Sequence, residues 1–458
     1  MIYKFQLTMS NVTKQIVVID VVGLELGHLN SNLLPHIKKI AEEGESAKMR
    51  PVFPSVTSTV QASILSGKYP EEHGIISNGL FDKVNNNVSF WEQSSNLVQA
   101  RRIWDIQDSK KNISSINSAV LFWQNTMYSM ADIVVTPRPI HMANNMIMWC
   151  YSKPVGYYDD ELKPKFGEFA LPTYWGPFAS SKSSQWIAEA TCYTLEKYRP
   201  RLTFTYIPHV DYSAQKYGKG SKEVKDDLAI ADDIVGKIVH SVELTGMMDA
   251  TQFIILSEYG FNTVSSSVSI NLKLREAGLL SVRKINSKEY IDYEMSEAFA
   301  MVDHQVAHVY VKEPSLSHTV RILENVKGID KVLSNRDDKK KLMIDNERTG
   351  DIIAISDQDK WFDYYWWYDN DTAPDFANTV DIHRKPGYDP LELFIDLKTK
   401  SIPLDTFLVK GSHGRPPNIE SHEGAAFYAS NYKTDIQRTA NNYVECVDVG
   451  KYLIRNVT

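Results

Sequence analysis

The 458-residue sequence has little cysteine, no excess of basic residues and no long hydrophobic run. Three cysteines are an odd number, and their wide separation excludes metal-ligand spacing, so neither a disulfide framework nor a zinc knuckle is expected. They are Cys150, Cys192 and Cys446. Fifty Lys and Arg against 57 Asp and Glu give a net charge of −7, which disfavours nucleic acid as a partner.

No apolar run reaches the roughly 18 residues that a transmembrane helix needs. The first apolar stretch, residues 16–24, is interrupted by Asp20, and the residues before it do not resemble an export signal. The sequence therefore predicts a cytoplasmic protein with no membrane partner. It leaves the oligomeric state open.

Aromatic residues are abundant, at 11% of the chain, and many lie in two proline-containing stretches. These stretches cover residues of about 123–180 and 356–405. We expect both to be insertions over the edge of a sheet, where long excursions often form the cap of a site. The alternative is that they only cover the sheet.

Strand-like and helix-like segments alternate along the rest of the chain, which predicts an α/β fold with a mostly parallel sheet between helices. No repeat or low-complexity linker divides it, so residues 1–458 are expected to form one domain with two cap insertions. The expected strands are 15–20, 113–122, 201–207, 251–256 and 306–312, and the expected helices are 34–43, 58–65, 222–244, 268–277 and 315–326.

Three of the expected strands lead directly into an acidic residue: Asp20, Asp211 and Glu258. Ligands of open α/β sheets bind beyond the carboxyl ends of the strands, so these carboxylates should converge. Clustered carboxylates repel one another unless a cation lies between them, which predicts a metal site. His413, flanked by glycines, is a further candidate ligand. The alternatives are ordinary loop acids and a turn histidine.

A proline-rich stretch, residues 51–56, passes into a helix with Thr57 at its N-terminus. Backbone N–H groups and the helix dipole favour an anion such as phosphate there. A threonine beside a metal can also be ionised into a nucleophile. The alternative is that Ser55 or Thr57 only caps the helix.

Taken together, the runs from Met49 to Thr57 and from Ser66 to Gly79 resemble the nucleotide pyrophosphatase/phosphodiesterase branch of the alkaline phosphatase superfamily. The segments 206–215, 256–260 and 381–390 resemble an uncharacterised prokaryotic-type sub-branch of that family. The acidic residues after the strands and the segment 411–414 lie where metal motifs of that family lie. The resemblance covers residues of about 14–270 and 405–430.

The resemblance implies a role for each matching residue. Asp20 and Thr57 would hold one metal ion, with Thr57 also the nucleophile that forms a phosphorylated intermediate. Asn78 and the backbone N–H after Thr57 would hold a phosphate oxygen. Asp211 and His413 would hold a second metal ion. Two ions, zinc in the family, would then stabilise the attacking and leaving oxygens.

Three residues depart from the family's pattern. Gln215 replaces a histidine, and Glu258-Tyr259 replaces an Asp-His pair. Oxygen donors suit Mg²⁺ or Mn²⁺ better than Zn²⁺, so the metal is predicted to be harder, or one site weaker. His304, and less strongly His209, could replace the missing imidazoles; the alternative is that they are packed histidines.

Three further residues are candidates for substrate contact. Trp175 and Trp366 could stack on a nucleobase or another planar leaving group, although an aromatic core of the insertion explains Trp366 equally well. Arg384 could bind a second phosphate, or it could be a solvated charge.

The sequence therefore predicts a metal-dependent hydrolase of phosphodiester or phosphoanhydride bonds, acting on a small phosphate ester or nucleotide-like substrate. Phosphonate, phosphomonoester or sulfate ester hydrolysis on the same fold is one alternative. Because two histidine ligands are missing, a non-catalytic protein that binds a phosphorylated metabolite is the other.

Overall fold

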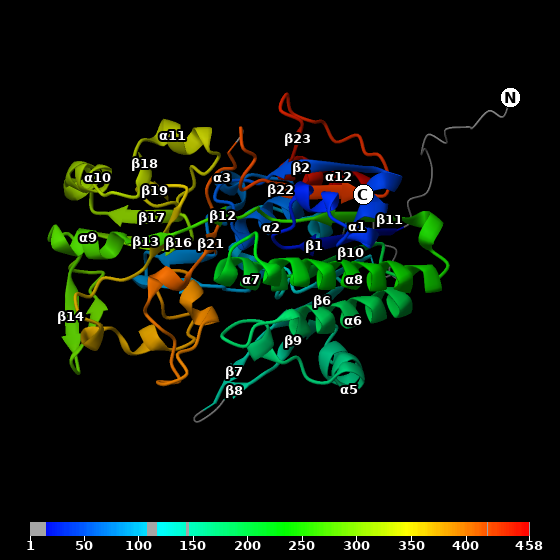
Figure 1. The fold of residues 1–458 in the computed structure, drawn as a ribbon, viewed down its shortest axis with the longest axis horizontal. Helices are drawn as coiled ribbons and strands as arrows, with labels where there is room; N and C mark the ends of the chain where they lie inside the picture. Colours follow the sequence, from blue (N-terminus) through cyan, green and yellow to red (C-terminus); the bar gives the residue numbers. More distant parts are fainter. Residues whose placement is uncertain (1–14, 108–116, 143–145, 419, 458) are drawn as a thin grey trace.

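The computed structural model describes residues 15–107, 117–142, 146–418 and 420–457 (Figure 1). A nine-stranded sheet forms its centre, in the order β23-β2-β22-β11-β1-β10-β5-β6-β9. Its strands are β1 (Gln15–Val21), β2 (Glu45–Arg50), β5 (Ser118–Leu121), β6 (Ile133–Pro137), β9 (Cys150–Lys153), β10 (Leu202–Ile207), β11 (Thr251–Leu256), β22 (Ala426–Ser430) and β23 (Tyr443–Glu445). The expected strand 113–122 is β5; residues 113–116 lie outside the described residues.

The middle of this sheet is parallel and fully buried. Strand β1 pairs in parallel with both β10 and β11, and all of its residues are buried. The register places Asp20 beside Tyr206 and Leu256, so the three strands end at one level. The chain segments that follow these strands therefore start at the same edge.

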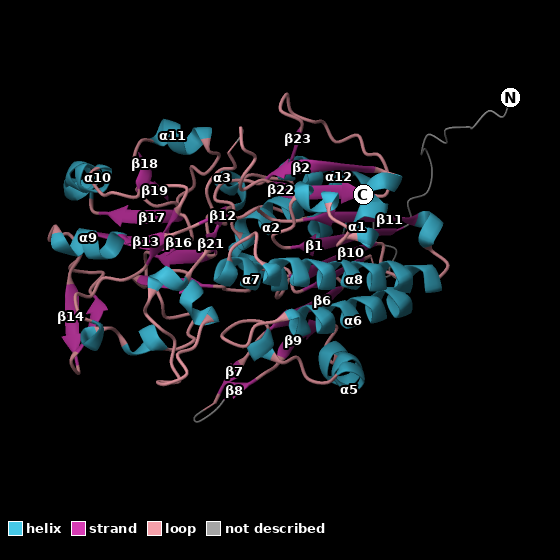
Figure 2. Ribbon diagram, viewed as in Figure 1, coloured by secondary structure: helices cyan, strands magenta, loops and turns pink. Residues whose placement is uncertain are grey.

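Helices flank the sheet in two groups (Figure 2). One group packs together α1 (Pro35–Glu43), α6 (Ser181–Tyr198), α7 (His209–Tyr217) and α8 (Lys222–Leu244), and in the other α2 (Thr57–Ser66) packs against α12 (Cys446–Val457). Helix α8 starts where the Ser221 side chain accepts the N–H of Val224, and its apolar residues recur at helical spacing toward the core. The prediction of an α/β fold with a mostly parallel sheet is confirmed.

A second sheet lies beside the first, at the left of Figure 1. It is antiparallel, in the order β16 (Ala298–Asp303), β17 (Val306–Val311), β19 (Ile352–Ser356) and β18 (Ile329–Leu333). The expected strand 306–312 is thus real but belongs to this sheet. A second hydrophobic cluster surrounds it, drawn mainly from residues 264–409.

One expected helix starts later than its sequence pattern indicates. Residues Ser266–Ser269 form strand β13, which pairs with β20 (Lys360–Asp363), and α9 covers only Ile270–Glu276. The pattern missed this because the partner strand lies about ninety residues away. The helix expected at 315–326 is α10 (Leu316–Glu324).

The two aromatic stretches have different roles. Residues of the first form β6 and β9, so this stretch extends the sheet at its edge instead of only covering it. The second, 356–405, lies within the larger second cluster, where most of its aromatic side chains are buried, whereas Tyr368 is exposed. The division into one domain with two caps stays a prediction. Among the helices of the described residues, none combines the length and apolar character needed to cross a membrane.

Candidate active site

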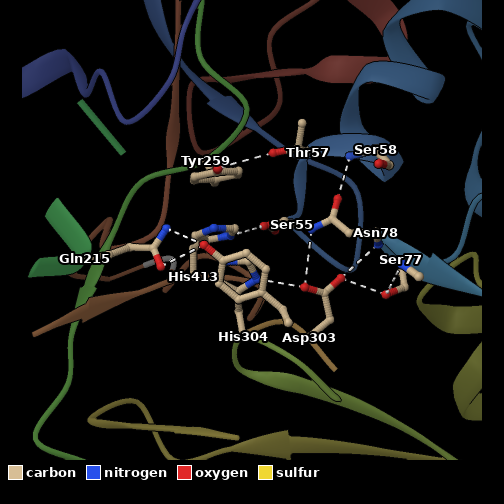
Figure 3. Close-up of polar contacts among 12 residues, drawn as sticks. Ser55, Thr57, Ser58, Ser77, Asn78, Gln215, Tyr259, Asp303, His304 and His413 are labelled. Carbon is tan, nitrogen blue, oxygen red and sulfur yellow. Dashed lines mark hydrogen bonds and ion pairs between the residues drawn. The ribbon is translucent and has the colours of Figure 1, made fainter. Parts of the chain in front are cut away.

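Thr57 is the first residue of α2, and its side chain is buried. Its hydroxyl donates a hydrogen bond to Oε2 of Glu258 at 2.8 Å. It also lies 3.3 Å from the Tyr259 hydroxyl (Figure 3). The side chain does not cap α2, which Val56 precedes in extended conformation. Thr57 therefore has the orientation of a reacting or ligating group, and the capping alternative is excluded.

Asp20 and Glu258 form a buried pair of carboxyl groups next to Thr57. Both side chains have no solvent exposure, and Gln61 donates to Oδ2 of Asp20 at 3.2 Å. Burial raises the pKa of Asp20 to about 7, and burial together with the charge of Asp20 raises the pKa of Glu258. Oδ1 of Asp20 and Oε1 of Glu258 find no donor in the described residues. Such a pair needs a proton or a cation to be stable.

Asp211 occupies the first turn of α7, where Gln215 and Tyr259 both donate to it. The Gln215 amide donates to Oδ2 at 2.6 Å, and the Tyr259 hydroxyl donates to Oδ1 at 3.2 Å. Burial raises the pKa of Asp211 to about 6 and keeps the Tyr259 phenol protonated by raising its pKa. Gln215 and Tyr259 thus donate hydrogen bonds to the carboxylate of Asp211, which argues against their predicted role as metal ligands.

The rings of His413 and His304 lie against each other at an angle of 36°, with centroids 3.8 Å apart. His413 donates from Nδ1 to the carbonyl of Ser55 at 2.8 Å, and Nδ1 of His304 lies 2.7 Å from Oδ1 of Asp303. Both Nε2 atoms are buried and lack a partner in the described residues. His413 Nε2 lies 3.9 Å from Asp211. Carboxylate- or carbonyl-oriented imidazoles with a free second nitrogen are typical of metal ligands.

Asn78 is held by Asp303, a residue that the sequence analysis missed. The Asn78 backbone N–H donates to Asp303 at 2.8 Å, and the Ser77 hydroxyl donates to the same oxygen at 2.7 Å. Burial opposes ionisation of Asp303, but its bonds with His304 and Ser77 hold its pKa below the ordinary value. Asp303 thus joins the predicted phosphate-binding amide to His304. Its position directly before His304 was the available signal.

Of the two groups predicted to donate to a phosphate oxygen, the Asn78 amide and the Ser58 backbone N–H, one is already hydrogen-bonded. The backbone N–H of Ser58 donates to Oδ1 of Asn78 at 2.9 Å, so this N–H is already engaged. The Asn78 side-chain nitrogen makes one bond, to Asp303 at 3.3 Å, and keeps a second hydrogen. The amide of Asn78 is therefore the better oxyanion donor of the two.

The remaining predicted residues lie outside this cluster or at its margin. Both ring nitrogens of His209 are engaged, with Ser184 and the carbonyl of Asp227, so it cannot replace a ligand. Trp366 is 1% exposed in the second cluster, which supports a core role and not a substrate contact. Arg384 is exposed and pairs with Asp375 and Asp381, as expected of a solvated charge.

Trp175 lines a cavity next to the site, together with Tyr388. Tyr388, also missed from the sequence, stacks on His304 at 3.7 Å between ring centroids. Its hydroxyl exchanges hydrogen bonds with Gln215 at 2.8 and 2.9 Å. Tyr388 therefore separates this cavity from the histidine pair.

The donor set fits divalent metal ions by its chemistry. Four buried atoms without hydrogen-bond partners belong to two carboxyl groups and two imidazoles: Asp20, Glu258, His304 and His413. Within the described ranges, however, no three His, Cys, Asp or Glu side chains are grouped as a metal site. The Thr57 hydroxyl would be a further ligand of a cation between Asp20 and Glu258, because it lies 2.8 Å from Oε2 of Glu258.

These pKa shifts predict how pH changes the stability of the metal-free protein. The folded chain keeps protons on Asp20 and Asp211 at pH values where the unfolded chain has lost them, so stability should fall between pH 4 and about 7. Buried histidines such as His413 act in the opposite direction, but only below the unfolded pKa of about 6.5. Between pH 6.5 and 8, deprotonation of the pair formed by Asp20 and Glu258 should therefore lower the melting temperature of the wild type, and the fall should be smaller in the double variant Asp20→Asn/Glu258→Gln. A parallel fall in both proteins would contradict this assignment.

Known proteins resemble this chain over most of its length. Residues 16–389 match the family described as "Type I phosphodiesterase / nucleotide pyrophosphatase". A bis(5'-adenosyl)-triphosphatase from Mus musculus is 27% identical over 55% of this chain and 48% of its own. Venom phosphodiesterase 2 from Crotalus adamanteus is 25% identical over 53% of this chain and 26% of its own. The chain thus spans about half or less of the length of these relatives.

Solved structures share the fold. The phosphonoacetate hydrolase of Sinorhizobium meliloti 1021, in complex with phosphonoformate, superposes with a TM-score of 0.65 at 15% identity, over 98% of this chain and 96% of that chain. Murine ectonucleotide pyrophosphatase/phosphodiesterase 5, in complex with AMP, gives 0.61 at 13% identity, over 97% and 95%. With the family match covering residues 16–389, the chain belongs to the type I phosphodiesterase / nucleotide pyrophosphatase family.

Proposed function

We propose that this protein is a metal-dependent hydrolase of phosphodiester or phosphoanhydride bonds that works through a phosphorylated Thr57. The observation that carries the proposal is the Thr57 hydroxyl at the start of α2, directed at the carboxyl pair of Glu258 and Asp20. The family match and the nucleotide and phosphonate ligands of the related structures support phosphorus chemistry.

Each residue has a defined part in the reaction. Oγ1 of Thr57 attacks phosphorus as its proton passes to Oε2 of Glu258, the bond from phosphorus to the leaving alkoxide breaks, and the alkoxide takes a proton from water to leave as the alcohol. Water then attacks the phosphothreonine ester and releases Thr57. The Asn78 amide donates to a phosphoryl oxygen, and Asp303 fixes its position. Divalent ions held by Asp20, Thr57 and Glu258, and by Asp211, His413 and His304, would neutralise charge on phosphorus.

The mixed donor set leaves two metal types to compare. The two imidazoles favour Zn²⁺ in the second group, whereas the first group has only oxygen donors, which favour Mg²⁺ or Mn²⁺. The fold shared with phosphonoacetate hydrolase makes phosphonate cleavage the second candidate function.

A substrate panel tests the proposal. Purified protein with Zn²⁺, Mn²⁺ or Mg²⁺ should hydrolyse bis(p-nitrophenyl) phosphate at least about tenfold faster than p-nitrophenyl phosphate, p-nitrophenyl sulfate or phosphonoacetate, because a group is expected on each side of phosphorus. Faster cleavage of phosphonoacetate would favour the second candidate. Absence of turnover together with absence of bound metal would favour a binding protein.

A further inference from the structure

Four aromatic rings of the candidate active site contact one another in series. In order they are Tyr259, His413, His304 and Tyr388, with successive ring centroids 3.4, 3.8 and 3.7 Å apart. The two imidazoles are the inner rings and the two phenols are the outer rings, and all four side chains are buried (Figure 3). Rings packed at this spacing restrict one another's planes, so the phenols help to orient the imidazoles.

Both outer phenols also act on one carboxylate, that of Asp211. Tyr259 donates directly to Oδ1 at 3.2 Å. Tyr388 acts through Gln215: its hydroxyl donates to Oε1 at 2.9 Å and accepts from Nε2 at 2.8 Å. Nε2 of Gln215 in turn donates to Oδ2 of Asp211 at 2.6 Å. Each carboxylate oxygen has two acceptor sites, so these bonds orient Asp211 and leave it able to bind a cation.

The segment around Tyr388 is fixed to the end of strand β16. The Tyr388 N–H donates to the carbonyl of Val302 at 3.0 Å, and Gly387 forms an isolated bridge with the same residue. A Cβ at Gly387 would overlap the Val302 side chain, so this close approach requires glycine. Beyond Tyr388, Asp389 forms a buried ion pair with Lys385 at 2.8 Å. The ring of Tyr388 is therefore held in place independently of its hydroxyl.

From these contacts we infer that Tyr388, acting through Gln215, is a positioning residue for the metal ligands Asp211 and His304. The inference rests on the proposed function, in which these two side chains hold a divalent ion. Gln215 occupies a position where the family has a histidine, so here an amide and a phenol orient a ligand in place of supplying one. Ligands that are fixed before binding lose less freedom when they bind, which makes metal binding tighter.

Tyr388→Phe tests the inference, because phenylalanine keeps the ring on His304 and removes only the two bonds to Gln215. The affinity for Zn²⁺, measured by competition with a chelating dye, should fall about tenfold or more for one bound equivalent. For bis(p-nitrophenyl) phosphate, kcat should fall by a similar factor and KM should change by less than about twofold. Tyr365→Phe is the matched control, since the buried Tyr365 hydroxyl has no partner in the described residues. Its Zn²⁺ affinity should equal that of the wild type.

A double-variant cycle shows whether the hydroxyl acts through Gln215. Gln215→Ala should lower the Zn²⁺ affinity at least as much as Tyr388→Phe. The double variant should bind Zn²⁺ no more weakly than Gln215→Ala alone, because both bonds of the Tyr388 hydroxyl are to Gln215. Additive losses would show that Tyr388 acts by another route and would overturn the inference.

Metal binding separates this inference from the proposed function. Wild-type Zn²⁺ affinity in Tyr388→Phe would overturn the inference and leave the diesterase in place. Wild-type affinity in Gln215→Ala would overturn it as well, whether or not Tyr388→Phe folds. Loss of affinity in both variants, with no turnover by the wild type, would support the inference and reject the proposed function. A wild type that binds none of Zn²⁺, Mn²⁺ and Mg²⁺ would reject both.

Discussion

Replacing Thr57 by alanine is expected to lower diester hydrolysis by about 10⁴-fold or more, because it removes the atom that attacks phosphorus. The hydroxyl contacts Glu258 and Tyr259 and does not cap the helix, so its loss removes these two contacts and leaves α2 intact. Steady-state kinetics with bis(p-nitrophenyl) phosphate, measured beside circular dichroism and metal content, checks this result.

Thr57→Ser is the matched control for that variant. Serine keeps an attacking hydroxyl at the helix start, so part of the activity should remain, well above that of Thr57→Ala. Thr57→Ala protein that is folded, loaded with metal and fully active would show that Thr57 is not the nucleophile.

Glu258→Gln is expected to separate stability from activity. An amide removes the charge that Asp20 and Glu258 place together in a buried site, so the metal-free variant should melt at a higher temperature at pH 8 than the wild type. The variant should also lose one bound metal equivalent and about 10²-fold or more in kcat. Differential scanning calorimetry and elemental analysis of the same preparation measure both effects.

Glu276→Gln supplies the control for this second experiment. Glu276 pairs with Lys273 on the surface of α9, and exposed pairs of this kind contribute little to stability. Its metal content, kcat and melting temperature should stay near wild type. Unchanged metal content in Glu258→Gln would remove the carboxyl pair from the metal site.

Local patterns predicted the parts of the fold that depend on nearby residues. Residues 222–244 have apolar residues at helical spacing, and α8 has those limits. The strand before Asp20 is continuously apolar because both of its faces are covered. The spacing of three acidic residues after parallel strands then placed Asp20 and Glu258 together, as the structure shows.

Long-range pairing explains what the sequence could not provide. Strand β17 has a clear pattern, but nothing in it indicates the second sheet, because its partners are selected by burial in the tertiary structure. For the same reason Asp303 was missed: it reaches Asn78 from the turn of a hairpin more than two hundred residues away. Tyr388 lies in the segment 381–390 that resembles the sub-branch, but that resemblance assigned no role to it.

The direction in which side chains point was the second feature that the sequence did not predict. Gln215 and Tyr259 follow the acidic residues at the positions where the family has histidines, so they were expected to face a metal. Their donors instead face Asp211, because an amide N–H and a protonated phenol satisfy a buried carboxylate. At a motif position, the residue type predicts where the side chain lies better than it predicts which group the side chain binds.

The central claim is that Thr57 forms a covalent intermediate, and the configuration at phosphorus tests it most directly. A phosphorothioate diester of one configuration is hydrolysed in ¹⁸O-labelled water, and the product configuration is determined. Each in-line displacement inverts phosphorus, so attack by Thr57 followed by attack by water predicts overall retention. Overall inversion would mean that water attacks directly and would contradict the account.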